Sequence, residues 1–287
     1  MTDWYIFAII ALLFLGAQRF LYKVSAERQC NSAWTSFSFM GTVAVLSSVL
    51  FLARNEPVTN LYFLLFISLV NSASFLTGTI TTIEALKRVP TSVAYPIIRL
   101  NTAVVVIFSI VYFKDRLSIY QVLGIVLAVV VILVLVRYDH DGPRIRDKNV
   151  RMGFVLVFLS LFSGAIAAIS AKFAAMYTYN LAFIAVSYIF STFFSLGLRK
   201  RLTTEQERTN DKDAFIIGCF MGLANFIGFY AFLKALSTGP LSIVVAITGT
   251  YFVIAIMLSA LIYREKLTLL RIVGVFLTII AVTLMRI

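Results

Sequence analysis

Arg99 is the side chain of this sequence best suited to binding chemistry. It stands about eight residues into an apolar run that begins near residue 91, which places it roughly 12 Å along a helix rising 1.5 Å per residue. A guanidinium at that depth is costly unless it faces a cavity or an acid. Its planar fork suits bidentate binding of a carboxylate or a phosphate, so we predict that it contacts a ligand. The alternative is a permanent pair with Glu84 or with helix-end carbonyls.

Other polar side chains in the apolar runs are candidates for orienting the same ligand by hydrogen bonds. The position 150 residues after Arg99 is Gly249, with Thr and Tyr neighbours, so one half of the chain would supply a charge and the other a small polar face. The alternative for each candidate is a bond to a neighbouring helix. The candidates are Gln18, Thr81, Tyr95, Asn101, Asn225, Tyr230, Thr248 and Tyr251.

The remaining charged residues near the runs favour structural roles. Glu84 has Lys87 and Arg88 three and four residues later, which predicts an ion pair at a helix end. Lys23, Lys172 and Lys234 stand late in apolar runs. Lysines at such depths usually extend their amino groups to the interface, and a role in a cavity is the alternative.

Catalytic and metal chemistry are not favoured. His140, the single histidine, lies between two aspartates in a polar segment, which is more typical of a solvated turn than of a metal site. The runs contain no Ser-His pair, no acidic cluster for Mg²⁺ and no phosphate-binding glycine loop. We therefore expect no enzyme activity, no metal and no cofactor, and any transport would be secondary. Cys30 and Cys219 lie in dissimilar surroundings, so a disulfide framework is not expected.

The composition predicts that these residues are positioned inside a lipid bilayer. The 287 residues are 61% hydrophobic and 13% charged, with a mean hydropathy of +0.95, whereas charged residues normally make up about a quarter of a soluble domain. The net charge is +12. Its Lys and Arg residues lie mostly between apolar runs, which favours anionic lipid head groups and topology control over nucleic acid. The expected partners are membrane lipids and a small-molecule substrate, without nucleic acid; the oligomeric state stays open.

Apolar windows of about 20 residues predict an all-α membrane protein with ten transmembrane helices. Pro90 and Pro240 fall between windows, where each starts a new helix. The expected spans are residues 4–23, 33–53, 60–86, 91–113, 118–136, 152–175, 181–198, 214–236, 241–263 and 268–286.

An internal repeat divides these spans into five and five. Residue types recur at an offset of 150, and the polar segment at 137–151 is the natural seam. We expect one five-helix repeat over residues 1–143 and a second over 144–287. An odd number of spans per repeat makes the second copy enter the membrane from the opposite side, and such inverted halves permit alternating access to a site near the bilayer midplane. The recurring residues are Gly78, Ala85, Leu86, Pro90, Ser92, Ser109, Leu117, Gly124 and Leu127, matched by Gly228, Ala235, Leu236, Pro240, Ser242, Ser259, Leu267, Gly274 and Leu277.

The chain resembles the EamA-type drug/metabolite transporters in three features. These are the ten spans, the pattern from Gly16 to Lys23 that recurs at Gly164 and Lys172, and the short charged turns that close spans four and nine. The usual acid after span four in that family is Glu, where this chain has Asp115. The resemblance implies a central cavity lined by spans one, three, four, six, eight and nine, and export as the direction. The deep carboxylate in the first helix of small drug/proton antiporters is replaced here by Gln18 and Arg19, which disfavours export of cations driven by a buried acid.

Charge also predicts orientation. The segments at 137–151 and 199–213 together hold ten Lys and Arg residues, and the positive-inside rule makes both cytoplasmic and both termini external. The overall expectation is a secondary transporter, an exporter of a small polar metabolite with an anionic or zwitterionic group, in a bacterial inner (plasma) membrane. The alternative is a non-transporting membrane partner or a lipid-handling subunit.

Overall fold

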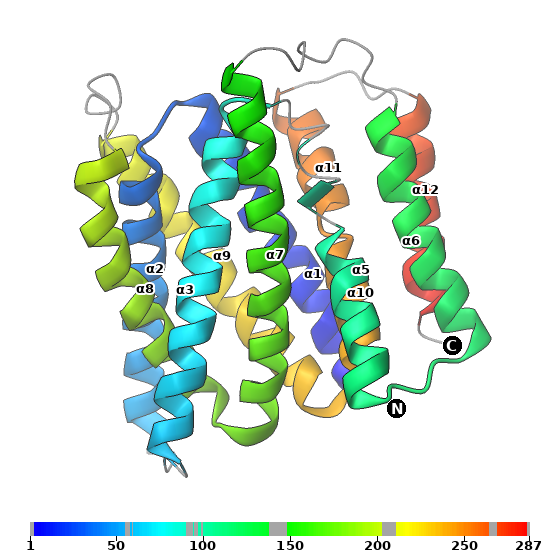
Figure 1. Cartoon of the computed structure of the whole chain (residues 1–287), viewed down its shortest axis with the longest axis horizontal. Coiled ribbons are helices and arrows are strands. Elements are labelled where there is room, and N and C mark those ends of the chain that lie inside the picture. Colours follow the sequence, from blue (N-terminus) through cyan, green and yellow to red (C-terminus); the bar gives the residue numbers. More distant parts are fainter. Residues whose placement is uncertain are drawn as a thin grey trace.

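The structure is a computed structural model that describes residues 3–54, 58, 60–89, 94, 97–98, 100–137, 148–202, 211–263 and 269–285. All the regular structure over these residues is helical, and they form no strand (Figure 1). The expected all-α architecture is therefore confirmed.

The helices follow the apolar runs closely. Asn60 shows how one begins, because its side chain accepts a hydrogen bond from the Phe63 amide and so caps the helix. In the first half the elements are α1 (Asp3–Glu27), α2 (Ser32–Arg54), α3 (Leu61–Leu86), α5 (Asn101–Phe108), the π-helix η1 (Ser109–Phe113) and α6 (Ile119–Arg137). In the second half they are α7 (Lys148–Tyr177), α8 (Asn180–Leu202), α9 (Asp211–Thr238), α10 (Leu241–Gly249), α11 (Phe252–Tyr263) and α12 (Leu269–Leu284).

Six helices within the described ranges are long and apolar enough to cross a membrane: α1, α2, α3, α7, α8 and α9. Shorter apolar helical stretches cover residues 101–113, 119–130, 241–255 and 272–284. The outward faces carry large apolar side chains, among them Leu52, Phe66, Phe193 and Leu261, each more than 60% exposed. Such a surface suits lipid rather than water.

The span expected at 241–263 is not one continuous helix. It is interrupted between α10 and α11, where the amides of Thr250 and Tyr251 bond to carbonyls only three residues earlier. Gly249 ends α10 against α5, and a Cβ at that position would lie 2.6 Å from Thr102 Oγ1. Hydropathy reports how apolar a run is and cannot locate a turn set by such close packing.

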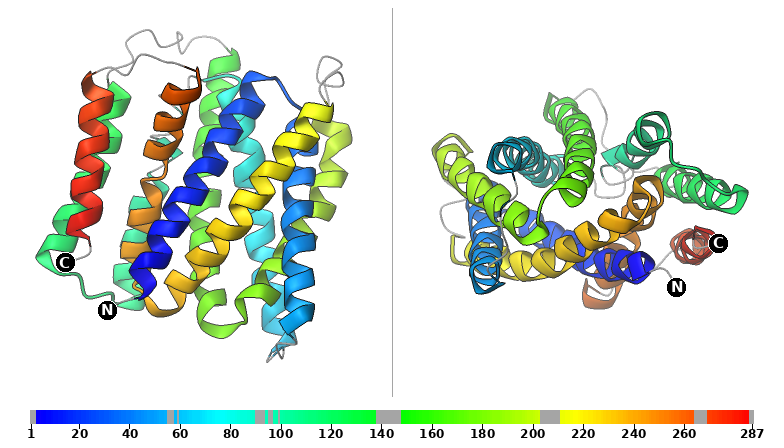
Figure 2. Two further views of the ribbon diagram at one scale, coloured as in Figure 1. Left: turned by 180° about the vertical axis from the view of Figure 1, so that it is seen from behind. Right: turned by 90° about the horizontal axis from the view of Figure 1, so that it is seen from below.

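The packing pairs helices from the two halves of the chain. α1 packs mainly on α9, α3 on α7 and α2 on α8, while α6 and α12 form a pair at one edge of the bundle (Figure 2). α1 begins at the end of the bundle where both termini lie, whereas α7 begins at the opposite end (Figure 1). The interior between α1, α3 and α7 is thus bounded by both halves.

Candidate functional site

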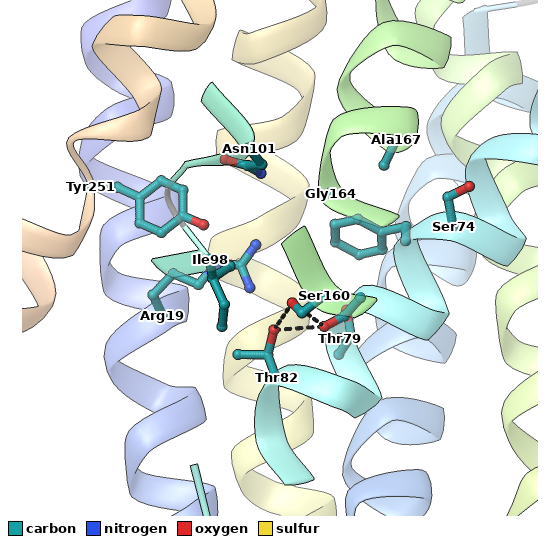
Figure 3. A pocket seen from close by; sticks show the side chains of 12 residues that line it. Arg19, Ser74, Thr79, Thr82, Ile98, Asn101, Ser160, Gly164, Ala167 and Tyr251 are labelled. Carbon is teal, nitrogen blue, oxygen red and sulfur yellow. Dashed lines mark hydrogen bonds between the residues drawn. The ribbon is translucent and has the colours of Figure 1, made fainter. Parts of the chain in front are cut away.

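A small cavity lies where α1, α3, α5 and α7 approach the turn between α10 and α11 (Figure 3). Its volume is about 30 Å³, which is space for one or two water molecules. Both halves of the chain contribute to its walls. The lining residues are Arg19, Ser74, Phe75, Gly78, Thr79, Thr82, Ile98, Asn101, Ser160, Gly164, Ala167 and Tyr251.

Arg19 is the charged residue of this lining. It stands roughly 24 Å from the start of α1 and roughly 12 Å from its end, at 1.5 Å per residue. Its Cζ lies 4.7 Å from the centre of the Tyr22 ring and 5.0 Å from that of Tyr251. These cation–π contacts stabilise and orient the guanidinium at the cavity.

The polar groups of the wall opposite Arg19 form hydrogen bonds with one another (Figure 3). The hydroxyl groups of Thr82 and Ser160 lie 2.6 Å apart, and both donate to the Gly78 carbonyl, at 2.6 and 3.2 Å. On α7, Gly164 has no side chain where Asn101 packs; a Cβ there would lie 2.6 Å from Asn101 Nδ2. The absence of a side chain at Gly164 therefore permits the Asn101 amide to reach the cavity.

A buried polar network adjoins the cavity and joins four helices. Gln18 Nε2 donates to the Tyr22 hydroxyl at 2.9 Å, and Asn225 Nδ2 donates to Gln18 Oε1 at 3.1 Å. Tyr188 in turn donates to Asn225 Oδ1, and the Tyr22 and Thr79 hydroxyl oxygens lie 3.3 Å apart. The network holds Tyr22, and therefore the ring on which Arg19 stacks.

The residues predicted from the sequence divide among several places. Asn101 and Tyr251 line the cavity, whereas Gln18 and Asn225 are buried in the adjoining network. The hydroxyls of Thr81 and Thr248 donate to carbonyls of their own helices, Thr77 O and Val244 O. Arg99 and Tyr95 lie outside the described residues.

Tyr230 does not line the Arg19 cavity. It lines a second cavity, of about 180 Å³, with Lys234 and residues where α7 ends and α8 begins. Its hydroxyl accepts a hydrogen bond from Arg54 at 3.4 Å.

Arg19 was not predicted to bind a ligand; the sequence marked it only as a residue in the region where related antiporters carry an acid. The available signal was a lone basic residue between Asp3 and Tyr22 in an otherwise apolar run. Tyr188, which completes the network from α8, gave no such signal, because a tyrosine in an apolar helix is most often packing or an interface anchor.

The chain also matches a known family at the sequence level. The model of the EamA-like transporter family matches residues 2–137 and again residues 151–287. The chain belongs to the EamA-like transporter family. Membership of a transporter family agrees with a non-enzymatic role and with an integral membrane location, as expected from the composition.

Two relatives extend the comparison of this EamA-like transporter. An uncharacterized protein of Methanocaldococcus jannaschii is 24% identical over 130 residues, which are 45% of this chain and 93% of that protein. A protein known from a crystal structure superposes with a TM-score of 0.79 at 13% identity, covering 99% of this chain and 96% of the other. The latter similarity shows the fold alone.

Two charged side chains of this EamA-like transporter bind groups at helix ends. Glu84 forms ion pairs with Lys87 at 2.9 Å and Arg88 at 2.6 Å, and Ser32 donates to it at 2.6 Å. The expected helix-end ion pair is confirmed. Lys172 is buried and donates to the carbonyls of Leu236 and Gly239 near the end of α9.

Proposed function

We propose that this protein is a secondary transporter that moves a small polar metabolite across a bacterial plasma membrane by alternating access. The observation that carries the proposal is the Arg19 cavity, which residues of both halves line inside an apolar bundle. A cation at such depth in a membrane protein marks a substrate or ion pathway by default. Export is the direction that resemblance to EamA-type proteins implies.

We further propose that ten spans form two inverted five-helix repeats, over residues 1–143 and 144–287. Support comes from the two family-model matches and from α1 and α7, which begin at opposite ends of the bundle (Figure 1). Support also comes from the packing, because exchanging the halves converts the α1–α9 pair into the α7–α3 pair. Inverted repeats let one central site open alternately to either face.

The proposed substrate carries a carboxylate, a phosphate or a zwitterionic group. Arg19 supplies a guanidinium whose planar fork suits such groups, and Asn101 and Tyr251 supply hydrogen-bonding groups on the same cavity. Arg99 follows one lining residue, Ile98, and precedes another by two positions. We retain Arg99 as a proposed second contact to the anionic group.

Ligand-dependent melting of the purified protein tests this proposal. Amino acids, nucleotides and sugar phosphates are screened singly, since a ligand that binds the folded form raises its melting temperature. For any ligand that stabilises the wild type, Arg19→Ala and Arg99→Ala should abolish the shift. The matching Lys variants should weaken it, because they keep the charge and lose the fork.

Lys212→Ala is the matched control, since Lys212 is an exposed cation at the start of α9. It should leave the ligand-induced shift unchanged. An unchanged shift in both Arg→Ala variants would remove the two arginines from the binding site. Loss of folding in both the Ala and the Lys variants would assign them a structural role instead.

The small volume of the cavity favours one other candidate, a non-transporting membrane partner or lipid-handling subunit. A cavity of about 30 Å³ holds no metabolite without rearrangement. Flux into proteoliposomes separates the two candidates, because a partner protein would bind no screened metabolite and transport none.

A further inference from the structure

The turn between α9 and α10 is held from two sides by opposite charges. Lys172 of α7 donates from Nζ to Leu236 O at 2.8 Å and to Gly239 O at 3.0 Å. Asp115, in the segment between η1 and α6, accepts at Oδ2 from the Ser242 amide at 3.1 Å and the Ser242 hydroxyl at 2.7 Å. The turn lies at the end of the bundle where both termini lie (Figure 2).

Each charge suits the helix end that it meets. The carbonyls near the end of α9 carry partial negative charge, which Lys172 complements, and the amides at the start of α10 carry partial positive charge, which Asp115 complements. Ser109 of η1 donates to the same Oδ2 atom at 2.6 Å. We call Asp115 with Ser109 and Ser242 the Asp115 clasp.

The local backbone aims Asp115 at this contact. The π-helix η1 ends at Phe113, and Lys114 then adopts a left-handed conformation, with φ of 54°, which is uncommon for a residue other than glycine. This reversal returns the next carboxylate onto Ser109. The clasp thereby joins the last helical turn of one span in the first half to the first turn of α10 in the second half.

The sequence repeat carries the same residue types in exchanged halves. At the offset of 150, Glu265 corresponds to Asp115, Ser259 to Ser109, and Ser92 to Ser242. Pro90 likewise corresponds to Pro240. An acid, two serines and a proline thus recur together, as expected if both halves of the chain use the same device. In an inverted repeat the second copy would act at the opposite end of the bundle.

We infer that the Asp115 clasp is the gate that holds the two halves together at the terminal end, and that its release is a step of the transport cycle. This inference rests on the proposed alternating access. Asp115 is a positioning residue, since it acts through Ser242 and α10 and lies outside the lining of the Arg19 cavity. The counterpart acid, Glu265, serves as the matched comparison with the opposite expected effect.

Electron-spin distance measurements on the full chain in lipid nanodiscs test the inference without any substrate. One label pair, at Tyr120 and Ser237, spans the terminal end; another, at Glu27 and Arg151, spans the opposite end. All four residues are exposed. Asp115→Asn should raise the longer-distance population at the terminal end about tenfold, the size expected when a charge-assisted hydrogen bond becomes a neutral one. The longer-distance population at the opposite end should fall in the same variant. Glu265→Gln should shift both pairs in the reverse sense.

The outcomes separate this inference from the proposed function. If the wild type shows two populations at each end but Asp115→Asn leaves their ratio unchanged, the clasp is not the gate, and alternating access stands. A single population at both ends in every variant overturns the gate together with alternating access. Should Asp115→Asn fail to fold, Ser242→Ala removes one of the hydrogen bonds to Asp115 and must produce the same paired shift, failing which the inference is wrong.

Discussion

At the scale of single residues, the setting of Arg19 explains why it suits a binding role. A flexible arginine loses side-chain entropy when it binds, and stacking between rings restricts that freedom in advance. Tyr22, one of the two rings, is itself held by Gln18 and by contact with Thr79. Replacing a residue of the network should therefore lower the affinity for a ligand at Arg19, even though that residue does not contact the ligand.

Cys30 allows a prediction that needs no ligand. It lies between α1 and α2, fully buried, and burial raises the pKa of its thiol. Because the thiolate is the nucleophile, we expect Cys30 in the folded protein to react with iodoacetamide more slowly than a free thiol at every pH from 7 to 9. Mass spectrometry of the alkylated peptide measures the rate.

The raised pKa also fixes the sign of a pH effect. The folded protein holds the thiol proton more tightly than the unfolded chain does, so this contribution to stability is present below the ordinary thiol pKa and falls as pH rises above it. Cys30→Ala should remove that part of the alkaline loss of stability. Rapid alkylation of native Cys30 at pH 7, matching that of denatured protein, would contradict the burial.

At the scale of elements, hydropathy predicted the long helices well, because the apolar length needed to cross a bilayer is written in the sequence. α1, α3 and α9 begin and end within a few residues of the expected spans. The turn between α10 and α11 and the π-helix η1 were not predicted, since both depend on packing between helices. The same limit applies to the site: the sequence does not show which inward-facing residue of α1 lines the cavity, as Arg19 does, and which enters the adjoining network, as Gln18 does.

The contact between α9 and α2 gives a prediction at this scale. A Cβ on Gly222 would lie 2.6 Å from Thr42 Cβ and 2.9 Å from the Phe39 carbonyl oxygen, so Gly222→Ala forces the two helices apart. Overpacking of this kind costs about 1–3 kcal/mol. We expect a lower melting temperature in detergent for Gly222→Ala.

Gly197 of α8 supplies the matched control for this contact. A Cβ built at Gly197 would have no atom within 4 Å beyond its own stretch of helix, and alanine is a better helix former than glycine by about 1 kcal/mol. Gly197→Ala should therefore leave the melting temperature unchanged or raise it. Equal melting temperatures for the two variants would show that α2 and α9 do not pack through Gly222.

At the scale of the whole molecule, charge and architecture bear on the same question of orientation. The termini, the α7–α8 connection and the α9–α10 turn lie at one end of the bundle (Figure 1). The described ends of α6 and α8 and the starts of α7 and α9 lie at the opposite end (Figure 1). The sequence concentrates basic residues between α6 and α7 and between α8 and α9, and bilayers retain such segments on the cytoplasmic side. With this orientation, the gate proposed at the Asp115 clasp faces the outside of the cell.

Cysteine labelling tests this orientation in living cells. In a background with Cys30→Ala and Cys219→Ala, single substitutions at Asp141 and Thr204 report on the two basic segments, and Ser237→Cys reports on the terminal end. An impermeant maleimide applied to intact cells should modify Ser237→Cys alone, and all three should react after the membrane is permeabilised. The expectation rests on the ten basic residues in segments 137–151 and 199–213. Modification of the Asp141 or Thr204 variant in intact cells, with none at position 237, would reverse the orientation and make the Asp115 clasp the cytoplasmic gate.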